Sequence, residues 1–173
     1  QLGQVLFLDG GSSTTAILAE RLSQLSGLVV ITNSVDVATR LGAPDSLEQR
    51  RNRVVLIGGD FSANAAATFG PAAINDIHRH TADLAFLSPF GLDAGAGATS
   101  YDPDEAEIAR AMFARARRRV LMADHSKLGT VSRVSYAALS GVDQIVVDAR
   151  AAQSDALPAI RAACPQVLVA PRG

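Results

Sequence analysis

The sequence predicts an α/β domain with a mostly parallel sheet, helices on both faces of the sheet and a Rossmann-like order of elements. Apolar, β-branched runs recur along the 173 residues, and segments with helical periodicity lie between several of them. Because the runs are apolar throughout rather than alternating, they are typical of strands covered on both faces. Alternation of such strands with helices favours a parallel sheet. No repeat, low-complexity tract or linker divides the chain, so we expect one domain over residues 1–173.

The individual elements follow from the same patterns. The first helix, for example, has Ile17, Leu18, Leu22 and Leu25 at helical spacing. The expected strands are Val5–Leu8, Leu28–Thr32, Val54–Ile57, Leu84–Leu87, Val120–Ala123, Ile145–Val147 and Val167–Val169. The expected helices are Ser13–Ser26, Val35–Leu41, Pro71–Arg79, Asp104–Arg118 and Asp155–Ala163. The polar segment Pro44–Arg53 is expected to form a surface loop.

Composition and charge argue against several classes of protein. The net charge is −1, so no overall basic surface attracts nucleic acid. The single cysteine, Cys164, rules out an internal disulfide framework and fits a reducing cytosol; among apolar neighbours we expect it to be buried and unreactive. No apolar run reaches the length that crosses a bilayer and no signal peptide opens the chain, so we expect a cytoplasmic location and no membrane partner.

The strongest functional signal is the segment Val5–Thr15. A buried strand ends in Asp9 and passes through glycines and hydroxyl residues into a helix. The first backbone N–H groups of a helix lack partners and its dipole is positive there, which favours an anion such as phosphate. The alternative is that one hydroxyl caps the helix and the glycines only turn the chain. The candidate anion-binding residues are Gly11, Ser12, Ser13, Thr14 and Thr15.

Small or polar residues also follow each of the first five expected strands. In an open parallel sheet, ligands bind beyond the carboxyl ends of the strands, so these tips favour one shared pocket. The tips are Asp9-Gly-Gly-Ser-Ser-Thr, Thr32-Asn33-Ser34, Gly58-Gly59-Asp60, Ser88-Pro-Phe-Gly91 and Asp124-His-Ser-Lys127.

Further motifs continue this series along the chain. They are Ile31-Thr-Asn-Ser34, Gly70-Pro-Ala-Ala73, Asp83-Leu-Ala-Phe86, Gly91, Gly97, Glu105-Ala-Glu-Ile-Ala-Arg-Ala-Met112 and Ala123-Asp-His-Ser-Lys-Leu-Gly129. Each motif is weak alone. In this order, from Val5 to Val147, the chain resembles the C-terminal effector-sensing domain of the DeoR family of bacterial transcriptional regulators.

This resemblance implies a fold similar to ribose-5-phosphate isomerase and CoA transferases, bound to a phosphorylated sugar or polyol. Family members carry a helix-turn-helix DNA-binding domain ahead of the sensor. We find none in this sequence, so operator DNA is expected to be reached only through that absent domain. The expected function is ligand-gated transcriptional control by a repressor, without catalysis and without a metal or redox cofactor. Regulators that read paired half-sites are usually dimers or multiples of dimers, which predicts a homo-oligomer, a dimer or a tetramer.

The resemblance places the phosphate at the Ser12–Thr15 loop, in agreement with the argument from the helix terminus. Asp9 either accepts a hydrogen bond from a sugar hydroxyl or only orders the loop as an Asx-turn. At the next tip, Asn33 beside Thr32 offers a donor and an acceptor to the ligand, or the tip caps the helix that begins near Val35.

The remaining candidates lie further along the chain. Gly58 and Gly59 are expected to turn the chain with positive φ and to let it approach the ligand, although a plain tight turn has the same sequence. Gly91 and Gly97 bracket a Gly- and Ala-rich stretch that we expect to be a flexible loop closing over the ligand. The alternative is a disordered loop with no role.

Two charged residues complete the candidate set. Glu105 matches, in the resemblance, the glutamate that points towards the sugar in the isomerase-like pocket; in the first turn of its helix its charge is also favourable through the dipole alone. Lys127 supplies a point charge to an anionic ligand, or is a solvated surface lysine. Asp124 pairs with this lysine or holds its loop.

A sugar-phosphate isomerase is the alternative function. Isomerisation needs a positioned base and a group that polarises the carbonyl oxygen. The isomerase pattern has an acid-rich loop after the fourth strand and a lysine at a fixed spacing before the catalytic glutamate. Here that loop is Ser88–Asp93, Ala96 stands at the lysine offset, and only Glu105 remains. The run Asp124–Ser126 is not expected to form a catalytic triad, because residues adjacent in sequence rarely face one another.

Overall fold

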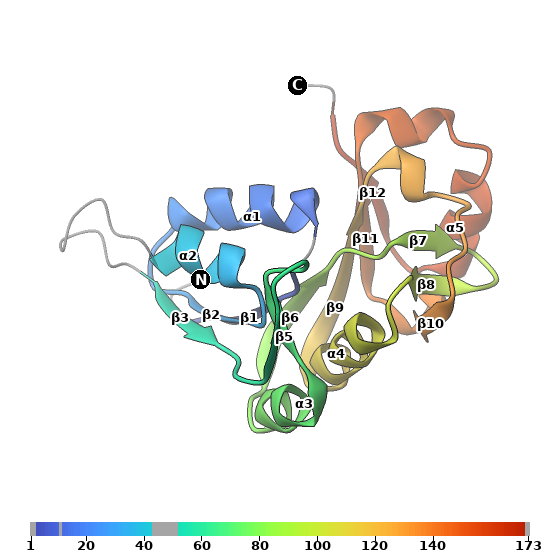
Figure 1. Ribbon diagram of the computed structural model, residues 1–173. Coiled ribbons are helices and arrows are strands. Elements are labelled where there is room, and N and C mark those ends of the chain that lie inside the picture. Colours follow the sequence, from blue (N-terminus) through green and yellow to red (C-terminus); the bar gives the residue numbers. More distant parts are fainter. Residues whose placement is uncertain (1–2, 11, 43–51, 172–173) are drawn as a thin grey trace.

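The computed structural model describes residues 3–10, 12–42 and 52–171 (Figure 1). Seven strands form one sheet in the order β12-β11-β9-β6-β1-β2-β3, and every neighbouring pair in it is parallel. The strands are β1 (Val5–Leu8), β2 (Val29–Thr32), β3 (Arg53–Leu56), β6 (Ala82–Leu87), β9 (Ala116–Ala123), β11 (Gln144–Val147) and β12 (Val167–Val169). The predicted parallel sheet is confirmed, and the seven predicted strands all belong to it.

Helices cover both faces of this sheet, as predicted (Figure 1). Because successive side chains of a strand point to opposite faces, Leu8 packs with Ala19 and Val37 on one face while Phe7 packs with Ile77 on the other. The first face carries α1 (Ser13–Ser23) and α2 (Val35–Gly42), and the second carries α3 (Gly70–His78), α4 (Pro103–Ala114) and α5 (Leu157–Ala163). Within the described ranges, no helix has the length and apolar character that crossing a bilayer requires.

Three helices are shorter than the sequence predicts, and one of them is α5, which begins at Leu157 rather than at Asp155. The helix expected over Asp104–Arg118 ends at Ala114, and from Ala116 the backbone pairs with Ala82 of β6. Sheet pairing satisfies the main-chain groups of this arginine-rich segment, which therefore joins β9 instead of extending α4. The first helix also ends before its predicted boundary, at Ser23.

Within the described residues, two small antiparallel sheets and three 3-10 helices go beyond the prediction. One sheet pairs β4 (Asp60–Ser62) with β5 (Ala67–Phe69). The other has β8 (Gly97–Ser100) between β7 (Gly91–Asp93) and β10 (Val134–Ala137). The 3-10 helices are η2 (His125–Lys127), η3 (Leu139–Gly141) and η4 (Ala149–Gln153). Most of the predicted surface loop Pro44–Arg53 lies outside the described residues.

The flexible loop expected between Gly91 and Gly97 is a β-hairpin, so that prediction is wrong. Asp93 stabilises the turn, because its Oδ1 accepts hydrogen bonds from two backbone N–H groups. A Cβ on Gly91 would lie 2.2 Å from the carbonyl oxygen of Thr130, and one on Gly97 would lie 2.1 Å from that of Ala137. Gly97 also has a φ of +79°. Both glycines are therefore required by close backbone contacts of this hairpin.

The strand order places a topological switch point between β1 and β6. From β1 the chain proceeds to β2 and β3 on one side, and then returns to β6 on the other side of β1. The connections after β1 and after β6 also lie on opposite faces, which carry α1 and α4 respectively. In open α/β sheets the crevice outside the carboxyl ends of two such strands is the usual ligand site. The candidate site is therefore built on Asp9 and Ser88, the residues that follow β1 and β6.

Candidate functional site

Asp9 links the two strand ends at the switch point. Its Oδ2 accepts a 2.7 Å hydrogen bond from the backbone N–H of Ser88, and its Oδ1 accepts one of 2.8 Å from the hydroxyl of Thr15. Burial raises the pKa of the Asp9 carboxyl to about 7, against the smaller opposing effects of these two hydrogen bonds and of the charge of Lys127. Asp9 thus orders its loop, which is one of the two roles that the sequence leaves open for it. Asp9 also lines the crevice.

The Ser88 hydroxyl connects the helix terminus to the only lysine of the chain. Its Oγ lies 2.9 Å from the Oγ of Ser12, and the Nζ of Lys127 donates to it at 2.9 Å. Burial lowers the pKa of Lys127, although the negative charges of Asp124 and Asp9 oppose this. The structure therefore brings the lysine to the crevice rather than leaving it as a solvated surface group.

The N-terminus of α1 contacts the mouth of the crevice through the hydrogen bond between Ser12 and Ser88, although Ser12, Ser13, Thr14 and Thr15 do not line the cavity themselves. Ser12 caps the helix, because its Oγ accepts a 3.1 Å hydrogen bond from the N–H of Thr14. Ser13 is exposed, Thr14 is half-buried, and the first turn carries no acidic residue. The positive end of the helix dipole is therefore not neutralised by its own sequence. The candidate residue Gly11 lies outside the described residues.

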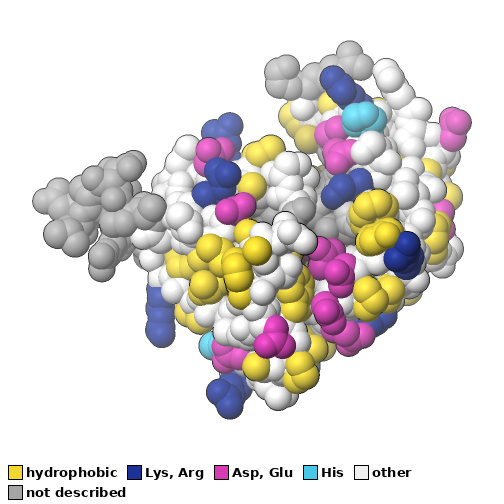
Figure 2. All heavy atoms as spheres, in the orientation of Figure 1, with side chains coloured by type: hydrophobic (Ala, Val, Ile, Leu, Met, Phe, Trp, Pro, Cys, Tyr) yellow, Lys and Arg dark blue, Asp and Glu magenta, His cyan; other side chains and the backbone are white. Residues whose placement is uncertain are grey.

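A cavity extends inwards from this mouth. Its empty volume is about 430 Å³, open solvent included. Figure 2 shows this face hollowed between the part that carries α1 and α2 and the part that carries β7 and β8. The lining residues are Asp9, Gly10, Asn33, Ala65, Ala67, Phe69, Ser88, Pro89, Ser100, Glu105, Ile108, Ala109 and Tyr136. The walls are thus apolar, with a few polar groups that converge from separate elements.

Asn33 is the most deeply buried polar residue of this lining, with 2% of its surface exposed. Its Nδ2 donates a 3.0 Å hydrogen bond to the carbonyl oxygen of Thr68 on β5. Its Oδ1 is buried and has no hydrogen-bond partner among the described residues. The tips of β1 and β2 also meet closely, since a Cβ on Gly10 would lie 2.7 Å from the Cβ of Ser34.

Glu105 enters the cavity from the first turn of α4. Its Oε2 accepts a 2.9 Å hydrogen bond from the hydroxyl of Ser100 on β8. Tyr136 of β10 lines the same cavity, and burial, followed by the negative charges of Asp9 and Glu105, raises its pKa well above the usual value. The unpredicted three-stranded sheet therefore supplies two polar residues of the lining, Ser100 and Tyr136.

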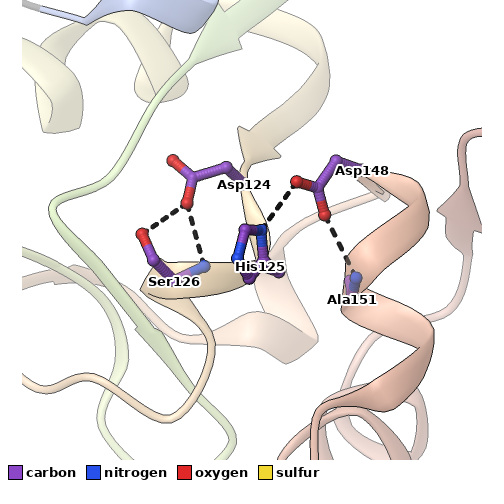
Figure 3. A network of polar contacts seen from close by, with 5 residues as sticks. All are labelled: Asp124, His125, Ser126, Asp148 and Ala151. Atoms are coloured by element: carbon purple, nitrogen blue, oxygen red, sulfur yellow. Dashed lines mark hydrogen bonds and ion pairs between the residues drawn. The ribbon is translucent and has the colours of Figure 1, made fainter.

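A polar network holds the segment that carries Lys127 (Figure 3). His125 Nδ1 lies 2.8 Å from Asp148 Oδ2, and Asp148 Oδ1 accepts a 3.1 Å hydrogen bond from the N–H of Ala151. Asp124 instead accepts hydrogen bonds from the N–H and the hydroxyl of Ser126. The imidazole therefore does not lie between this aspartate and this serine, so these three residues form no triad.

The other candidate residues have structural partners. The hydroxyl of Thr15 is fully buried against Asp9, and the Oγ1 of Thr32 accepts a 3.0 Å hydrogen bond from the N–H of Ser34. Gly59 has a φ of +142°, and a Cβ there would lie 2.4 Å from the carbonyl oxygen of Phe69, whereas Gly58 faces open space. The predicted positive φ holds for Gly59 and not for Gly58. Neither glycine lines the cavity, nor do Gly91 and Gly97.

The described residues show no metal centre. They contain no group of three or more His, Cys, Asp or Glu side chains arranged to hold an ion. The site is a crevice of hydrogen-bonding groups that includes the tips of β1, β2 and β6, with Lys127 attached to it through Ser88.

The family model of the DeoR C-terminal sensor domain matches residues 1–149. The chain belongs to this family of sensor domains. The strand-end motifs that define the crevice therefore lie within the matched part of the chain.

Relatives of this sensor domain are named as transcriptional regulators rather than as enzymes. It is 35% identical to the HTH-type transcriptional regulator GlpR of Haloferax volcanii over 84% of this chain and 54% of that protein. It is 29% identical to the Glycerol-3-phosphate regulon repressor of Escherichia coli over 85% of this chain and 56% of that protein. The sensor domain thus spans about half the length of these relatives.

Among solved structures, ribose 5-phosphate isomerase from Plasmodium falciparum matches 75% of this chain and 47% of its own, with 14% identity and a TM-score of 0.49. The regulator names of the relatives favour sensing over the alternative of an isomerase.

Proposed function

We propose that this domain binds a phosphorylated sugar or polyol in the crevice outside β1 and β6. We further propose that binding controls the attachment of a helix-turn-helix domain to operator DNA in the full-length regulator. One observation carries the proposal, which is that the crevice has two chemically different parts. Its mouth gathers a lysine and the N-terminus of α1, and its interior gathers oxygen atoms that accept hydrogen bonds. A phosphate suits the first part and a hydroxylated carbon chain suits the second.

The mouth is suited to a phosphate because donors of two kinds lie together there. The N-terminus of α1 offers backbone N–H groups beside the hydroxyls of Ser13 and Thr14. Lys127 adds a positive charge, held at the crevice by its hydrogen bond to Ser88. Ser12 takes part through its cap and its contact with Ser88.

The interior is suited to hydroxyl groups. Asp9, Asn33 and Glu105 turn oxygen atoms towards the cavity or line it directly. The apolar walls between them match the C–H faces of a sugar or polyol. The name of the Escherichia coli relative refers to a phosphorylated polyol of this kind, glycerol 3-phosphate.

Control of DNA binding follows from the position of the crevice. A ligand there contacts the tips of β1, β2 and β6 and the η2 segment at once, so it favours the arrangement in which these tips are close. Residues 1–173 then act as one effector-binding unit of a homo-oligomeric repressor, a dimer or a tetramer. The difference in ligand affinity between two arrangements of the oligomer sets the change in DNA binding.

Thermal unfolding with matched probes tests the proposal. Glycerol 3-phosphate and ribose 5-phosphate are compared with glycerol and ribose, and a bound probe at about 100 times its Kd adds about 2.7 kcal/mol of stability. At least one phosphorylated probe should raise the melting temperature far more than its free partner. The substitution Ser13→Ala should weaken this response, while Ser23→Ala at the other end of α1 should not. Equal responses to phosphorylated and free probes would remove the phosphate from the proposal.

A further inference from the structure

The orientation of the Asn33 side chain is fixed by its neighbour on β5. The carbonyl oxygen of Thr68 can only accept a hydrogen bond, so the amide nitrogen of Asn33 must face it, at 3.0 Å. Thr68 is itself held, because its N–H donates to the carbonyl oxygen of Asn33 at 2.9 Å and its hydroxyl donates to that of Ile57 at 2.6 Å. The Oδ1 of Asn33 consequently points away from β5.

This Oδ1 is a buried acceptor that lacks a donor. The residue is 2% exposed, lines the cavity and has no hydrogen-bond partner for Oδ1 among the described residues. Buried polar atoms of native proteins are nearly always paired, and an unpaired one at a cavity wall marks a place where a bound molecule supplies the partner.

The surrounding groups define what that partner is. Glu105 presents a carboxylate to the same cavity, and Asp9 lies at its entrance with both oxygens already accepting hydrogen bonds. Ala67 and Ile108 of the walls have no donor in their side chains, and the hydroxyls of Ser88, Ser100 and Tyr136, which also line the cavity, make no hydrogen bond to Asn33 Oδ1. A hydroxyl opposite Asn33 satisfies Oδ1, whereas a carbonyl oxygen there sets two acceptors against each other and a methylene leaves Oδ1 unpaired.

We propose that Asn33 is the specificity-determining residue of the crevice, and that it selects effectors with a hydroxyl over those with a carbonyl or a methylene at the same carbon. This inference rests on the proposed function and adds the orientation of the ligand. The phosphate lies at the mouth beside Lys127, because the negative charge of Glu105 would repel the phosphate from the interior. The hydroxylated carbon chain extends inwards from the phosphate to Asn33.

Two sets of probes measure the selection by titration calorimetry. The first set is glycerol 3-phosphate, dihydroxyacetone phosphate and 1,3-propanediol monophosphate, which carry a hydroxyl, a carbonyl and a methylene at the central carbon. The second is ribose 5-phosphate, ribulose 5-phosphate and 2-deoxyribose 5-phosphate. In the set that binds better, the hydroxyl-bearing probe should bind about tenfold more tightly than the other two, as expected when a buried acceptor loses its only donor.

The variant Asn33→Leu assigns the selection to this side chain. It should reduce the preference to less than about twofold, while Asn75→Leu, an exposed position on α3, should leave the preference unchanged. If Asn33→Leu does not fold, the Asn33 side-chain amide signals of the unaltered protein carry the test, because the hydroxyl-bearing probe should shift them and the methylene analogue should not.

The possible failures are distinct. If no phosphorylated probe binds, the proposed function itself fails. If phosphorylated probes bind and the three members of a set bind equally, or if the preference persists in Asn33→Leu, the role of Asn33 is overturned while phosphate binding stands.

Discussion

The backbone N–H of Ser88 donates a 2.7 Å hydrogen bond to Asp9 Oδ2, which joins the ends of β6 and β1 across the switch point of the sheet. The side chain of the same serine meets Ser12 at the α1 terminus and Lys127 of η2. Ser88 thus connects the end of β6, the turn between β1 and α1, and η2, which are three segments distant in sequence.

Replacing Ser88 with alanine keeps its backbone hydrogen bond and removes both side-chain contacts. We predict a loss of about 1 kcal/mol in the free energy of unfolding, the usual net value of partly buried hydrogen bonds of this kind. The response of the melting temperature to a phosphorylated probe should also fall, because Lys127 is no longer held at the mouth. Chemical denaturation and thermal unfolding measure the two effects. A variant with unchanged stability and unchanged probe response would contradict the connecting role of Ser88.

The raised pKa of Asp9 predicts a pH dependence of stability. The folded carboxyl titrates at about 7 and its usual value is 3.8, so between these values the folded state binds more protons than the unfolded state. The free energy of unfolding should therefore decrease as the pH rises from about 4 to about 7, by this group's contribution. The substitution Asp9→Asn should flatten that part of the profile, and Asp155→Asn on an exposed segment should not. Parallel profiles for Asp9→Asn and the unaltered protein would refute the assignment.

Lys127 can be followed by chemistry, because it is the only lysine of the chain. An amine-specific reagent labels Lys127 and the terminal amine, and mass spectrometry separates the two. Burial lowers the pKa of Lys127, so labelling should proceed at a lower pH than for an ordinary lysine. A phosphorylated probe should slow labelling of Lys127 and leave the terminal amine unaffected. Equal labelling rates at Lys127 with and without a probe that raises the melting temperature would place that probe elsewhere.

The hairpin glycines predict a purely structural effect. Gly97→Ala introduces a Cβ 2.1 Å from a backbone oxygen at a φ of +79°, so we expect a loss of about 1–3 kcal/mol in the free energy of unfolding. Gly141→Ala, where a Cβ meets nothing within 4 Å, is the matched control and should change stability by less than about 1 kcal/mol. Comparable losses in both variants would show that the close contact at Gly97 is not the cause.

The parallel sheet could be predicted because each of its strands is a continuous apolar run. Val5–Leu8 and Val167–Val169 have the predicted boundaries, and the buried Cys164 agrees with its apolar surroundings in the sequence. The arrangement of the strand tips followed from the same reasoning, since carboxyl ends of parallel strands meet at one edge. Asp9 lies in the lining of the crevice, whereas Lys127 reaches it through its hydrogen bond to Ser88.

The three-stranded sheet could not be predicted in the same way. Its Gly- and Ala-rich strands have few β-branched residues, and contacts with distant backbone, such as that between Gly97 and Ala137, fix them. As a result, Ser100 and Tyr136 were missed as lining residues. The unpaired Oδ1 of Asn33 could not be predicted from the sequence either, because it depends on which amide atom faces Thr68.

Amide NMR titration tests the central claim most directly, with glycerol 3-phosphate or ribose 5-phosphate, whichever stabilises the protein more. We predict that the largest shifts fall on Ser13, Thr14, Asn33 and Ser88, and that the unphosphorylated partner produces much smaller ones. Shifts concentrated on α5, β4 or β7, with the signals of these four residues unchanged, would contradict ligand binding in the crevice.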